Sequence, residues 1–429
     1  MPLTGDVAQP MLLGESDGGG ASGFAVLRAP SEILFGPGMR RSVGWLAARE
    51  GRRAYVIVDP YLSGQEEFEH VLASLRSEDV EVAICRDVEP ELPADLAVTV
   101  AADARRHGTE LIVAVGGGSC IDLAKVVATL LRHGGSPSDY YGEFGVPGPV
   151  VPLIAVPTTA GTGSEATPVA VVADATLGMK VGISSPHLIP RVAVCDPELT
   201  ITCPPEVTAA AGADALAHCV ESLTARQRQG TPELPRDRVF VGRSRLTDTL
   251  ALQGISALVA GLQVAYRDPT NLSARTETMY ASLLGGLAFG TAGTAAAHAL
   301  QYPIGVLTGT AHGVGVGCLL PYVMAYNQVE RLEEMAAIAR IFGASGPDGD
   351  LAGRAPHLVR DFLSALGIPR TLSAIGVSTE NVAWIAEQGV RAVRLSENNP
   401  RTLTLAAASA VVAAAVDGDL DAVPAAEDQ

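Results

Sequence analysis

The stretch LIVAVGGGSCIDLAK (residues 111–125) predicts a buried β-strand that turns through three glycines into a helix. A turn of this kind lets a pyrophosphate approach the backbone N–H groups at the positive end of the following helix. The stretch lacks the G-x-G-x-x-G spacing of the ordinary dinucleotide fingerprint, so a tight turn without a ligand stays an alternative. It therefore predicts a strand and a helix of an α/β domain, together with a candidate phosphate site.

Short apolar runs alternate with longer helical segments on the N-terminal side of this stretch. The predicted elements are, in order, strand 54–59, helix 66–77, strand 80–85, helix 94–107 and strand 111–115. Such alternation is typical of parallel strands that are joined by crossover helices.

The pattern changes after about residue 195, where β-type runs give way to Ala- and Leu-rich segments of helical period. These segments lie at 206–225, 247–266, 275–300 and 329–342. The apolar run 403–416 is too short to span a membrane and predicts a packed C-terminal helix. We therefore expect the second half to be all helical.

The length of 429 residues exceeds what one hydrophobic core usually organises, so two domains are expected. Residues 1–23 end in a run of Gly, Ala and Ser, which is the composition of a flexible leader. We predict this leader at 1–23, an α/β dinucleotide-binding domain at 24–195 and an α-helical domain at 196–425.

Composition narrows the class of partner and the compartment. A net charge of −17 disfavours binding to nucleic acid or to anionic membranes, because the long-range field repels phosphates. The six cysteines form no CxxC pair, which fits a reducing compartment. The sequence shows no basic segment followed by an apolar stretch at its N-terminus and no apolar run of about 20 residues. We expect a cytoplasmic protein that acts on small molecules.

Two further features could contact a dinucleotide. The loop PTTAGTGSE (residues 157–165) offers hydroxyls and flexible backbone, although a simple polar connector has the same composition. Asp59 ends a predicted strand, where its carboxylate could accept hydrogen bonds from a ribose and would repel a 2′-phosphate. The alternative for Asp59 is a cap of the turn that begins at Pro60.

A candidate metal site begins with Asp214 and His218, which lie four residues apart in a segment of helical character. Both side chains then project from one face of the helix. This spacing is common by chance, and a surface pair or a core histidine is the alternative.

His298 and His312 complete the candidate ligand set. We expect His298 on a helix and His312 on a loop, with Pro303 and Gly305 turning the chain between them. One carboxylate and three imidazoles suit a divalent iron or zinc ion and leave a position open for a substrate oxygen.

Taken together, these motifs resemble the iron-containing (group III) alcohol dehydrogenases over roughly residues 24–420. The resemblance rests on co-linear motifs that include GGGSCIDLAK (116–125), PTTAGTGSEAT (157–167), SPHLIP (185–190), CDPEL (195–199), DALAHCVES (214–222), HALQYPIG (298–305) and NNPR (398–401). It implies a dehydroquinate synthase-like fold, in which a Rossmann-like dinucleotide domain precedes an all-α metal-binding domain and the active site lies between them.

The resemblance also implies roles for individual residues. It implies that the metal is held by Asp214, His218, His298 and His312. It places the cofactor pyrophosphate at Gly117, Gly118 and Ser119, with Asp122 on the following helix, and the adenosine ribose at Asp59. The nicotinamide and phosphate contacts that it implies are Thr158, Thr159, Thr162 and Lys180.

Two positions near the implied active site attract attention. Many members carry a second histidine one helical turn after the third ligand, where this chain has Tyr302. Tyrosine titrates near ~10 and passes protons less readily at neutral pH than histidine, so the family's proton relay is in doubt here. Phe289 occupies a position that is often aromatic and near the substrate, with a plain core residue as the alternative.

An insertion at 226–245 separates the metal helix from the next motif. It contains six arginines against two acidic residues, in a protein that is otherwise acidic. Insertions of this kind are similar to those of hydroxyacid-oxoacid transhydrogenases and of reductases of small anionic aldehydes. We hypothesise that Arg236 and Arg238 clamp an anionic substrate, with solvated surface arginines or a subunit interface as the alternatives.

The resemblance implies hydride transfer between a nicotinamide cofactor and a small primary alcohol or aldehyde, with the metal as Lewis acid. We expect NAD rather than NADP, Fe²⁺ with Zn²⁺ as the alternative metal, and a homodimer or higher homo-oligomer. The alternatives within the family are a hydroxyacid-oxoacid transhydrogenase and a maleylacetate reductase-like enzyme. The alternatives of another class are a dehydroquinate synthase-like carbocyclising lyase and a redox-inactive binding protein.

Overall fold

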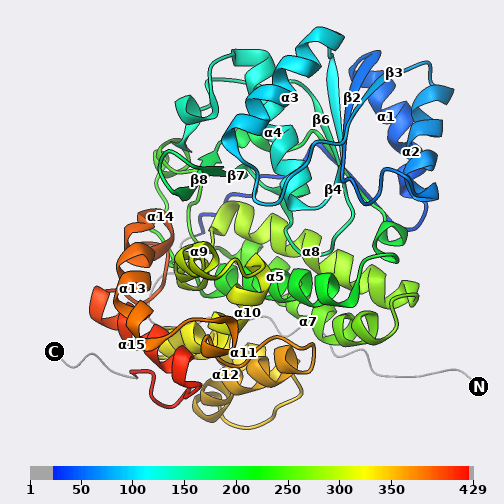
Figure 1. The fold of residues 1–429 in the computed structure, drawn as a ribbon. Coiled ribbons are helices and arrows are strands. Elements are labelled where there is room, and N and C mark those ends of the chain that lie inside the picture. The colour runs from blue at the N-terminus through cyan, green and yellow to red at the C-terminus, as the bar shows by residue number, and fades with distance from the viewer. Residues whose placement is uncertain (1–22, 425–429) are drawn as a thin grey trace, which may run out of the picture.

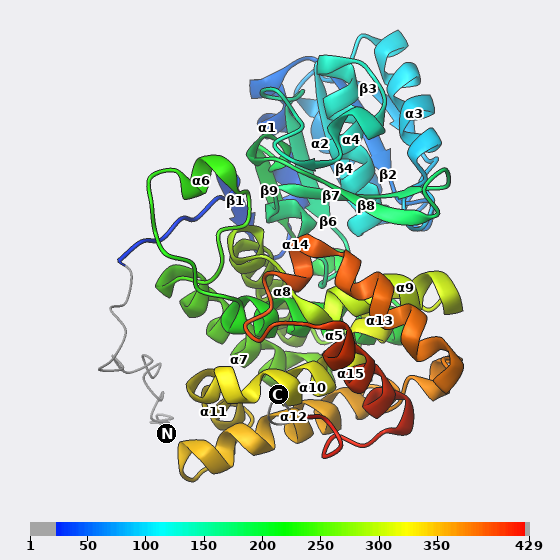
Figure 2. The same cartoon turned by 90° about the vertical axis from the view of Figure 1, so that its left-hand side faces the viewer.

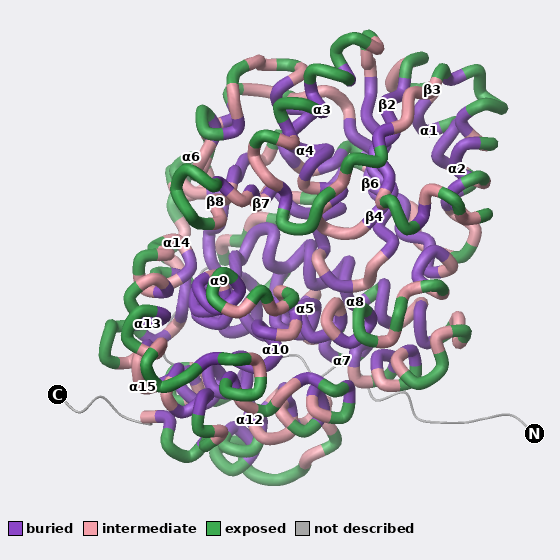
Figure 3. The backbone as a smooth tube through the Cα atoms, viewed as in Figure 1, coloured by how far each residue is buried: buried purple, intermediate pink, exposed green. Residues whose placement is uncertain are grey.

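The computed structural model describes residues 23–424, so residues 1–22 of the expected leader lie outside the described part. The chain is arranged as an α/β half above a helical half (Figure 1). The central strands of the main sheet and the centre of the helical half are buried, whereas exposed residues follow the outer helices and loops (Figure 3). The expected fold class, an α/β half followed by an α-helical half, is confirmed.

The main sheet of the described residues has six parallel strands in the order β1-β9-β6-β4-β2-β3. Its strands are β1 (Glu32–Phe35), β2 (Arg53–Val58), β3 (Glu81–Cys85), β4 (Leu111–Gly116), β6 (Leu153–Pro157) and β9 (Val192–Cys195). Parallel sheets that are covered on both faces need near-continuous apolar strands, and this explains the runs that the sequence analysis identified.

Alternate residues of each central strand face different helices. In β4, Ile112 and Ala114 belong to the core with α3 (Ala94–His107) and α4 (Gly118–His133). Leu111, Val113 and Val115 belong to the core on the opposite face, with α1 (Val43–Glu50) and α2 (Glu66–Ser77). Because side chains alternate along a strand, one apolar run serves both layers.

A second sheet, which the sequence analysis did not predict, covers α4. In the described part it has three strands in the order β5-β8-β7. Their bounds are β5 (Gly142–Glu143), β7 (Val169–Asp174) and β8 (Met179–Ser184). Ala170, Val172 and Ile183 of this sheet pack into the same core as α4.

The second half consists of helices, and across the described residues 196–424 the strand pairing is limited to one isolated bridge, Gln227 to Gly242. The helices are α5 (Pro205–Thr224), α6 (Leu234–Asp237), α7 (Arg245–Arg267), α8 (Leu272–Ala292), α9 (Ala296–Thr308), α10 (His312–Asn327), α11 (Leu332–Ile341), α12 (Asp348–Ser364), α13 (Val382–Arg391), α14 (Val393–Ser396) and α15 (Leu405–Asp417). Short 3-10 helices connect elements in both halves, at Met39–Ser42, Pro137–Tyr140, Ser164–Ala166, Pro186–Leu188, Pro197–Thr200, Gln328–Glu330, Ser373–Ile375 and Thr379–Asn381.

Three local expectations about the helical half were wrong. The segment 275–300 is not one helix, because the chain bends by 103° between α8 and α9 at a break that contains Gly293 with φ +84°. Pro303 does not turn the chain either, since it lies inside α9, and the turn comes at Gly309 in the left-handed conformation. His312 is the first residue of α10 rather than a loop residue.

The helix α7 is the one single helix of the described residues that is long and apolar enough to cross a membrane. It has 23 residues and a most apolar window of mean hydropathy 1.4, so length and composition alone would permit a span. The bent pair α8 and α9 meets the same criterion when it is counted as one span. In the fold, α7 packs against α5 and α8, and its buried residues belong to the helical core.

The two halves meet closely where the loop after β6 contacts α8. Gly163 has φ +62°, and a Cβ added there would lie 2.5 Å from Gly286 Cα. A Cβ added at Gly286 would in turn lie 2.7 Å from Gly163 O. Backbone therefore packs directly on backbone at this contact, and neither position has room for a side chain.

We predict that Gly286→Ala lowers the free energy of unfolding by about 1–3 kcal/mol, because the new methyl group overlaps the backbone of Gly163. Gly353→Ala is the matched control, since Gly353 also lies inside a helix but has nothing within 4 Å of its Cβ position. It should raise stability by about 0.5–1 kcal/mol through helix propensity. Thermal unfolding followed by circular dichroism measures both effects, and equal shifts in the two variants would contradict the packing argument.

Candidate metal and cofactor site

Helix α5 presents three polar side chains on one face. Asp214, His218 and Glu221 are spaced i, i+4 and i+7, which aligns them along the helix. All three are at most 5% exposed, so this row of polar groups lies inside the protein. Buried polar and charged side chains need partners, and the surrounding elements provide them.

The four predicted metal ligands come together around one atom, Asp214 Oδ1. The Nε2 atoms of His218, His298 and His312 lie 3.6, 3.5 and 3.6 Å from it. Ligands about 2.1 Å from a tetrahedral ion are separated by roughly 3.4 Å, so these spacings fit such an ion. In Asp214, His218 and His298 the ligand atoms all lie within 4.8 Å of one another, and His312 borders this group through the carboxylate.

Two of the ligand atoms have no hydrogen-bond partner among the described residues. These are Asp214 Oδ1 and His298 Nε2, and both are buried. An unsatisfied buried polar atom is costly unless an ion or a water completes it. A divalent cation between the two atoms would satisfy both, so the residues fit a metal.

The second ring nitrogen of two histidines is held by the protein. His218 Nδ1 lies 3.2 Å from the carbonyl oxygen of Gly161, and His298 Nδ1 lies 2.6 Å from Glu221 Oε2. With a proton on each Nδ1 donated to these acceptors, each Nε2 keeps its lone pair for a metal.

Glu221 was not identified by the sequence analysis, although its spacing from Asp214 and His218 was a usable signal. Besides His298, it accepts hydrogen bonds from the backbone N–H groups of Ala295 (2.9 Å) and Ala297 (2.7 Å). These groups lie at the start of α9, where helix N–H donors have no partner within the helix. One buried carboxylate therefore fixes both the imidazole of His298 and the helix that carries it.

Three of the four predicted ligands are in the protonation state that a metal needs at neutral pH. Burial lowers the pKa of His218 to about 4 and that of His312 to about 3, so both imidazoles are neutral at pH 7. Burial opposes charge on Asp214 as well, but the three nearby imidazoles outweigh it and hold the pKa of this carboxyl below its usual range. For His298, burial is outweighed by Glu221 and Asp214, which raise the pKa of this imidazole to about 9. A metal would therefore displace a proton from His298 Nε2.

Aromatic rings border the site. The ring of Phe289, on α8, stacks on His218 with the ring centroids 4.1 Å apart, so Phe289 contacts a predicted ligand directly. Tyr302, one turn after His298 on α9, has its ring centroid 6.3 Å from that of His312. Burial raises the pKa of Tyr302 above its ordinary value, so the phenol stays protonated at pH 7.

The glycine turn and the threonine loop meet at the carboxyl ends of β4 and β6. Gly116 is paired in register with Pro157, and α4 begins at Gly118 with Gly117 as its N-cap. A Cβ added at Gly117 would lie 3.3 Å from Thr159 Oγ1, and one at Gly118 would lie 2.7 Å from Thr162 Cγ2. The N-terminus of α4 is therefore bordered by threonine side chains, and Thr158, whose N–H donates to Gly116 O, is buried beside it.

Asp59 lies at the carboxyl end of the adjacent strand β2. Its Oδ1 accepts a hydrogen bond from the Tyr61 N–H (2.9 Å), which is the turn-capping contact considered as the alternative. A Cβ added at Gly116 would lie 3.2 Å from the Asp59 Cβ, so the carboxylate also lies beside the glycine turn. Asp59 can both cap the turn and bind a ribose, because its Oδ2 makes no hydrogen bond to the described residues.

The other predicted cofactor residues already have protein partners. Ser119 Oγ accepts from the Glu91 N–H (3.3 Å), and Lys180 Nζ lies 2.7 Å from Glu91 Oε1. Asp122 accepts from Ser164 Oγ (2.6 Å) and from the Val171 N–H (2.9 Å). Asp122 thus joins α4 to the loop after β6 and to β7.

Lys125, one turn after Asp122, strengthens the same junction. Its Nζ is fully buried and donates to Ser164 Oγ, Thr167 O and Val169 O at 2.9, 3.0 and 2.7 Å. Burial lowers the pKa of this lysine to about 8. The dinucleotide helix and the threonine loop are therefore held as one unit.

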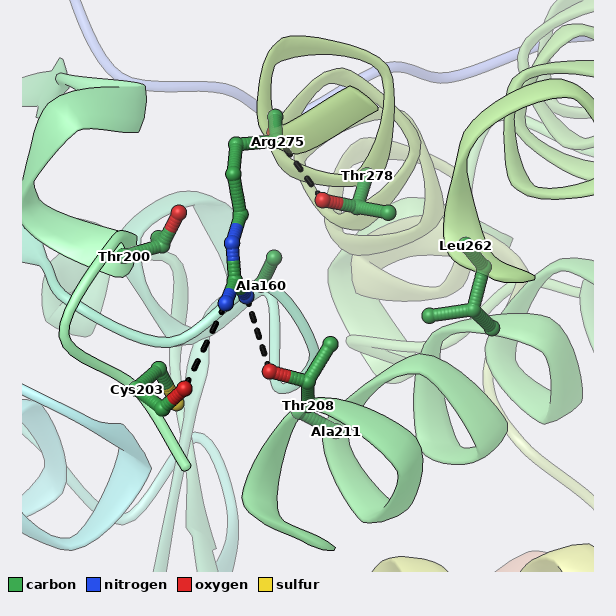
Figure 4. Close-up of a pocket in the computed structure, with 8 residues that line it drawn as sticks. All are labelled: Ala160, Thr200, Cys203, Thr208, Ala211, Leu262, Arg275 and Thr278. Atoms are coloured by element: carbon green, nitrogen blue, oxygen red, sulfur yellow. Dashed lines mark hydrogen bonds between the residues drawn. The ribbon is translucent and has the colours of Figure 1, made fainter. Parts of the chain in front are cut away.

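A small cavity on the other side of this loop is separate from the predicted ligands. Arg275 reaches from α8 toward the start of α5, where it donates to Thr208 Oγ1 and to the carbonyl oxygen of Cys203 (Figure 4). Ala160 also borders the cavity, and no predicted ligand or cofactor residue lines it. We interpret Arg275 as a structural contact that fixes the beginning of α5.

We predict that Glu221→Gln weakens divalent metal binding by about 10- to 100-fold, because the amide removes the charge that holds His298 Nδ1. Metal content per chain, measured by mass spectrometry after dialysis in metal buffers, tests this without relying on activity. Glu334→Gln is the control, since it removes another buried carboxylate, the partner of Arg243, and should lower stability but leave metal affinity unchanged. Equal metal affinity in Glu221→Gln and the unaltered protein would contradict the assignment.

Comparison with known proteins assigns the chain to a family. The model of the iron-containing alcohol dehydrogenases matches residues 30–197, and that of the C-terminal region of the Fe-containing alcohol dehydrogenase family matches residues 208–416. The chain is 34% identical to long-chain-alcohol dehydrogenase 1 of Geobacillus thermodenitrificans over 405 residues, which cover 91% of this chain and 98% of that protein.

Solved structures agree with this assignment. The crystal structure of a 1,3-propanediol oxidoreductase superposes with a TM-score of 0.85 at 31% identity, covering 91% of this chain and 100% of that one. The sulfoacetaldehyde reductase of Bifidobacterium kashiwanohense in complex with NAD⁺ gives a TM-score of 0.78 at 26% identity, covering 92% and 100%. The chain therefore belongs to the iron-containing alcohol dehydrogenase family and is an enzyme of that type.

Proposed function

We propose that the chain catalyses the reversible oxidation of a small primary alcohol to its aldehyde with NAD, using divalent iron held by Asp214, His218, His298 and His312. The observation that carries this proposal is the convergence of three imidazole nitrogens within 3.6 Å of one buried, unpartnered carboxylate oxygen. Zinc suits the same donors and is the alternative metal.

In the oxidising direction, the alcohol loses a hydride from its carbinol carbon to nicotinamide C4 and a proton from its hydroxyl to water. The products are the aldehyde, NADH and one proton, and the reverse reaction consumes the same three. When bound, the metal supplies Lewis-acid stabilisation of the substrate oxygen, and the nicotinamide carries the hydride.

Residues of the chain determine where these groups meet. His312 has 32% of its side chain exposed, against at most 7% for the other three ligands, and it therefore borders the side from which substrate enters. Tyr302 lies on this side as a neutral phenol that can hydrogen-bond a substrate oxygen. Gly161, in the threonine loop, contacts His218 directly, which supports placing the nicotinamide beside the metal.

The cofactor would lie along the carboxyl ends of β2, β4 and β6, as ligands do in open α/β sheets. We assign its pyrophosphate to Gly117, Gly118 and Ser119, near Asp122, and its ribose to Asp59. We assign its nicotinamide and phosphate contacts to Thr158, Thr159, Thr162 and Lys180. The relative solved with NAD⁺ supports NAD as the cofactor.

The domain boundaries, at 24–195 and 196–425, and the biological setting belong to the same proposal. The family membership shows a small-molecule substrate. We infer a cytoplasmic enzyme without nucleic-acid or membrane partners, because its net charge is −17 and α7, the single described helix that is long and apolar enough to span a membrane, packs against α5 and α8. We also expect a homodimer or higher homo-oligomer, which light scattering would measure.

We predict that His312→Ala lowers kcat by about three orders of magnitude, since it removes a ligand worth several kcal/mol of transition-state stabilisation. NAD binding, measured by fluorescence titration, should persist, because the proposed cofactor contacts lie in the other half of the chain. His357→Ala, a histidine on α12, is the control and should leave NADH formation unchanged. Full activity of a metal-stripped His312→Ala protein would overturn the metal assignment.

We further predict that the enzyme prefers NAD to NADP, because the Asp59 carboxylate would accept from a ribose 2′-hydroxyl and repel a 2′-phosphate. Asp59→Gly should narrow the ratio of kcat/KM for the two cofactors by about ten-fold or more. Asp87→Gly is the matched control, since Asp87 also follows a parallel strand but lies exposed beyond the edge strand β3. The placement of Asp59 is wrong if the unaltered enzyme uses NADP as efficiently as NAD.

A further inference from the structure

Two of the six arginines in the insertion 226–245, Arg238 and Arg243, are paired with acidic residues of the chain. Arg243 forms ion pairs with Asp248 and Glu334, and its side chain is only 10% exposed. Arg238 lies 3.9 Å from Glu143 and 3.5 Å from Glu397. Our hypothesis of an anion clamp at Arg236 and Arg238 therefore finds no support in these contacts.

Arg236 is also poorly placed for a clamp. It lies exposed on α6, which projects beside β1 on the outside of the molecule (Figure 2). The base of the insertion is closed by the bridge between Gln227 and Gly242 and by a hydrogen bond from the Arg243 N–H to Arg226 O (3.2 Å). The outer part of the insertion is thus a loop that is closed at its base and lies on the outside of the molecule.

The returning strand of this loop does reach the active-site helices. Val241 N–H donates to Thr291 O (2.9 Å), and a Cβ added at Gly293 would lie 3.2 Å from the Phe240 Cβ. Phe240 is 4% exposed, so its ring is buried beside the break between α8 and α9. This break leads directly into the helix that carries His298 and Tyr302.

Arg394, on α14, rests on Phe240. Its guanidinium carbon lies 4.5 Å from the centroid of the Phe240 ring, which is a cation–π contact. The side chain is partly buried, and within residues 23–424 it forms neither an ion pair nor a hydrogen bond. An arginine held on an aromatic face with its donors free is a common arrangement for recognising a planar or tetrahedral anion.

Arg394 also lies on a helix that packs against α9, which carries His298 and Tyr302. Burial raises the pKa of Tyr302, and the positive charge of Arg394 opposes this shift. Tyr302 in turn lies beside His312, the most exposed of the four ligands. The other nearby cation, Lys180, is paired with Glu91.

We propose that Arg394, held on Phe240 of the insertion, binds the anionic end of a short aldehyde or alcohol whose other end meets the metal site. The substrate class is a small carboxylate, sulfonate or phosphonate with a terminal aldehyde or primary hydroxyl. This inference rests on the proposed function and narrows it. In this proposal the insertion positions Arg394, which lies outside it, and does not itself supply the arginine that binds the substrate.

The test compares the iron-loaded enzyme on succinic semialdehyde and on pentanal, a neutral aldehyde of similar length, by NADH oxidation. The unaltered enzyme should favour the anion in kcat/KM by about ten-fold or more. Arg394→Met should remove most of this preference, mainly through a higher KM for succinic semialdehyde, and should change kcat/KM for pentanal by less than about two-fold. Arg394→Lys, which keeps the charge, should retain part of the preference and shows that loss of folding is not the cause.

Arg236→Met is the matched control and should behave like the unaltered enzyme. The proposal is overturned if the unaltered enzyme shows no preference, if Arg394→Met lowers both activities equally, or if Arg236→Met removes the preference as well. It is also overturned if Arg394→Met raises the KM for NADH instead, because the guanidinium would then bind a cofactor phosphate. Failure to oxidise NADH with either aldehyde would contradict the proposed function itself.

Discussion

The close contact between Gly163 and Gly286 is the constraint on which the site depends. The loop after β6 must approach α8 backbone to backbone, and only then does the carbonyl oxygen of Gly161 reach His218 Nδ1. The same loop is tied to α4 through Lys125 and Asp122, so the glycine turn and the metal helix are held at a fixed separation. A hydride must pass between two groups that belong to different halves of the chain, and this junction sets their distance.

A second constraint lies within the helical half. The four predicted ligands come from three helices, and α9 begins after a bend of 103°, so its direction must be fixed independently. Glu221 does this, because it binds the first N–H groups of α9 and the imidazole of His298 at the same time. The ligands are therefore arranged before any ion arrives, which reduces the reorganisation that binding requires.

Much of the fold could be predicted from periodicity, as the agreement for α2 and α3 illustrates. The prediction failed where a feature depends on contacts between distant segments. The bend at Gly293 interrupts an apolar pattern that continues without a break in the sequence. In the second sheet, β5 has only two residues and β8 (MKVGIS) mixes polar with apolar residues. The role of Glu221 could not be predicted because its partners lie more than 70 residues away in the sequence. The role of Arg394 could not be predicted because Phe240, the ring that it contacts, lies in the insertion.

The closed base of the insertion separates the loop structurally from the helices α5 and α7. The outer residues 229–237 can change in length or composition while the Gln227–Gly242 bridge keeps the ends together, so such changes would leave α5 and α7 in place. The helix α5 and the chemistry that it supports would then stay the same while the loop changes. Relatives that act on different substrates would accordingly differ in the loop and in α14. They would stay alike in α5 and α9, which carry the reaction.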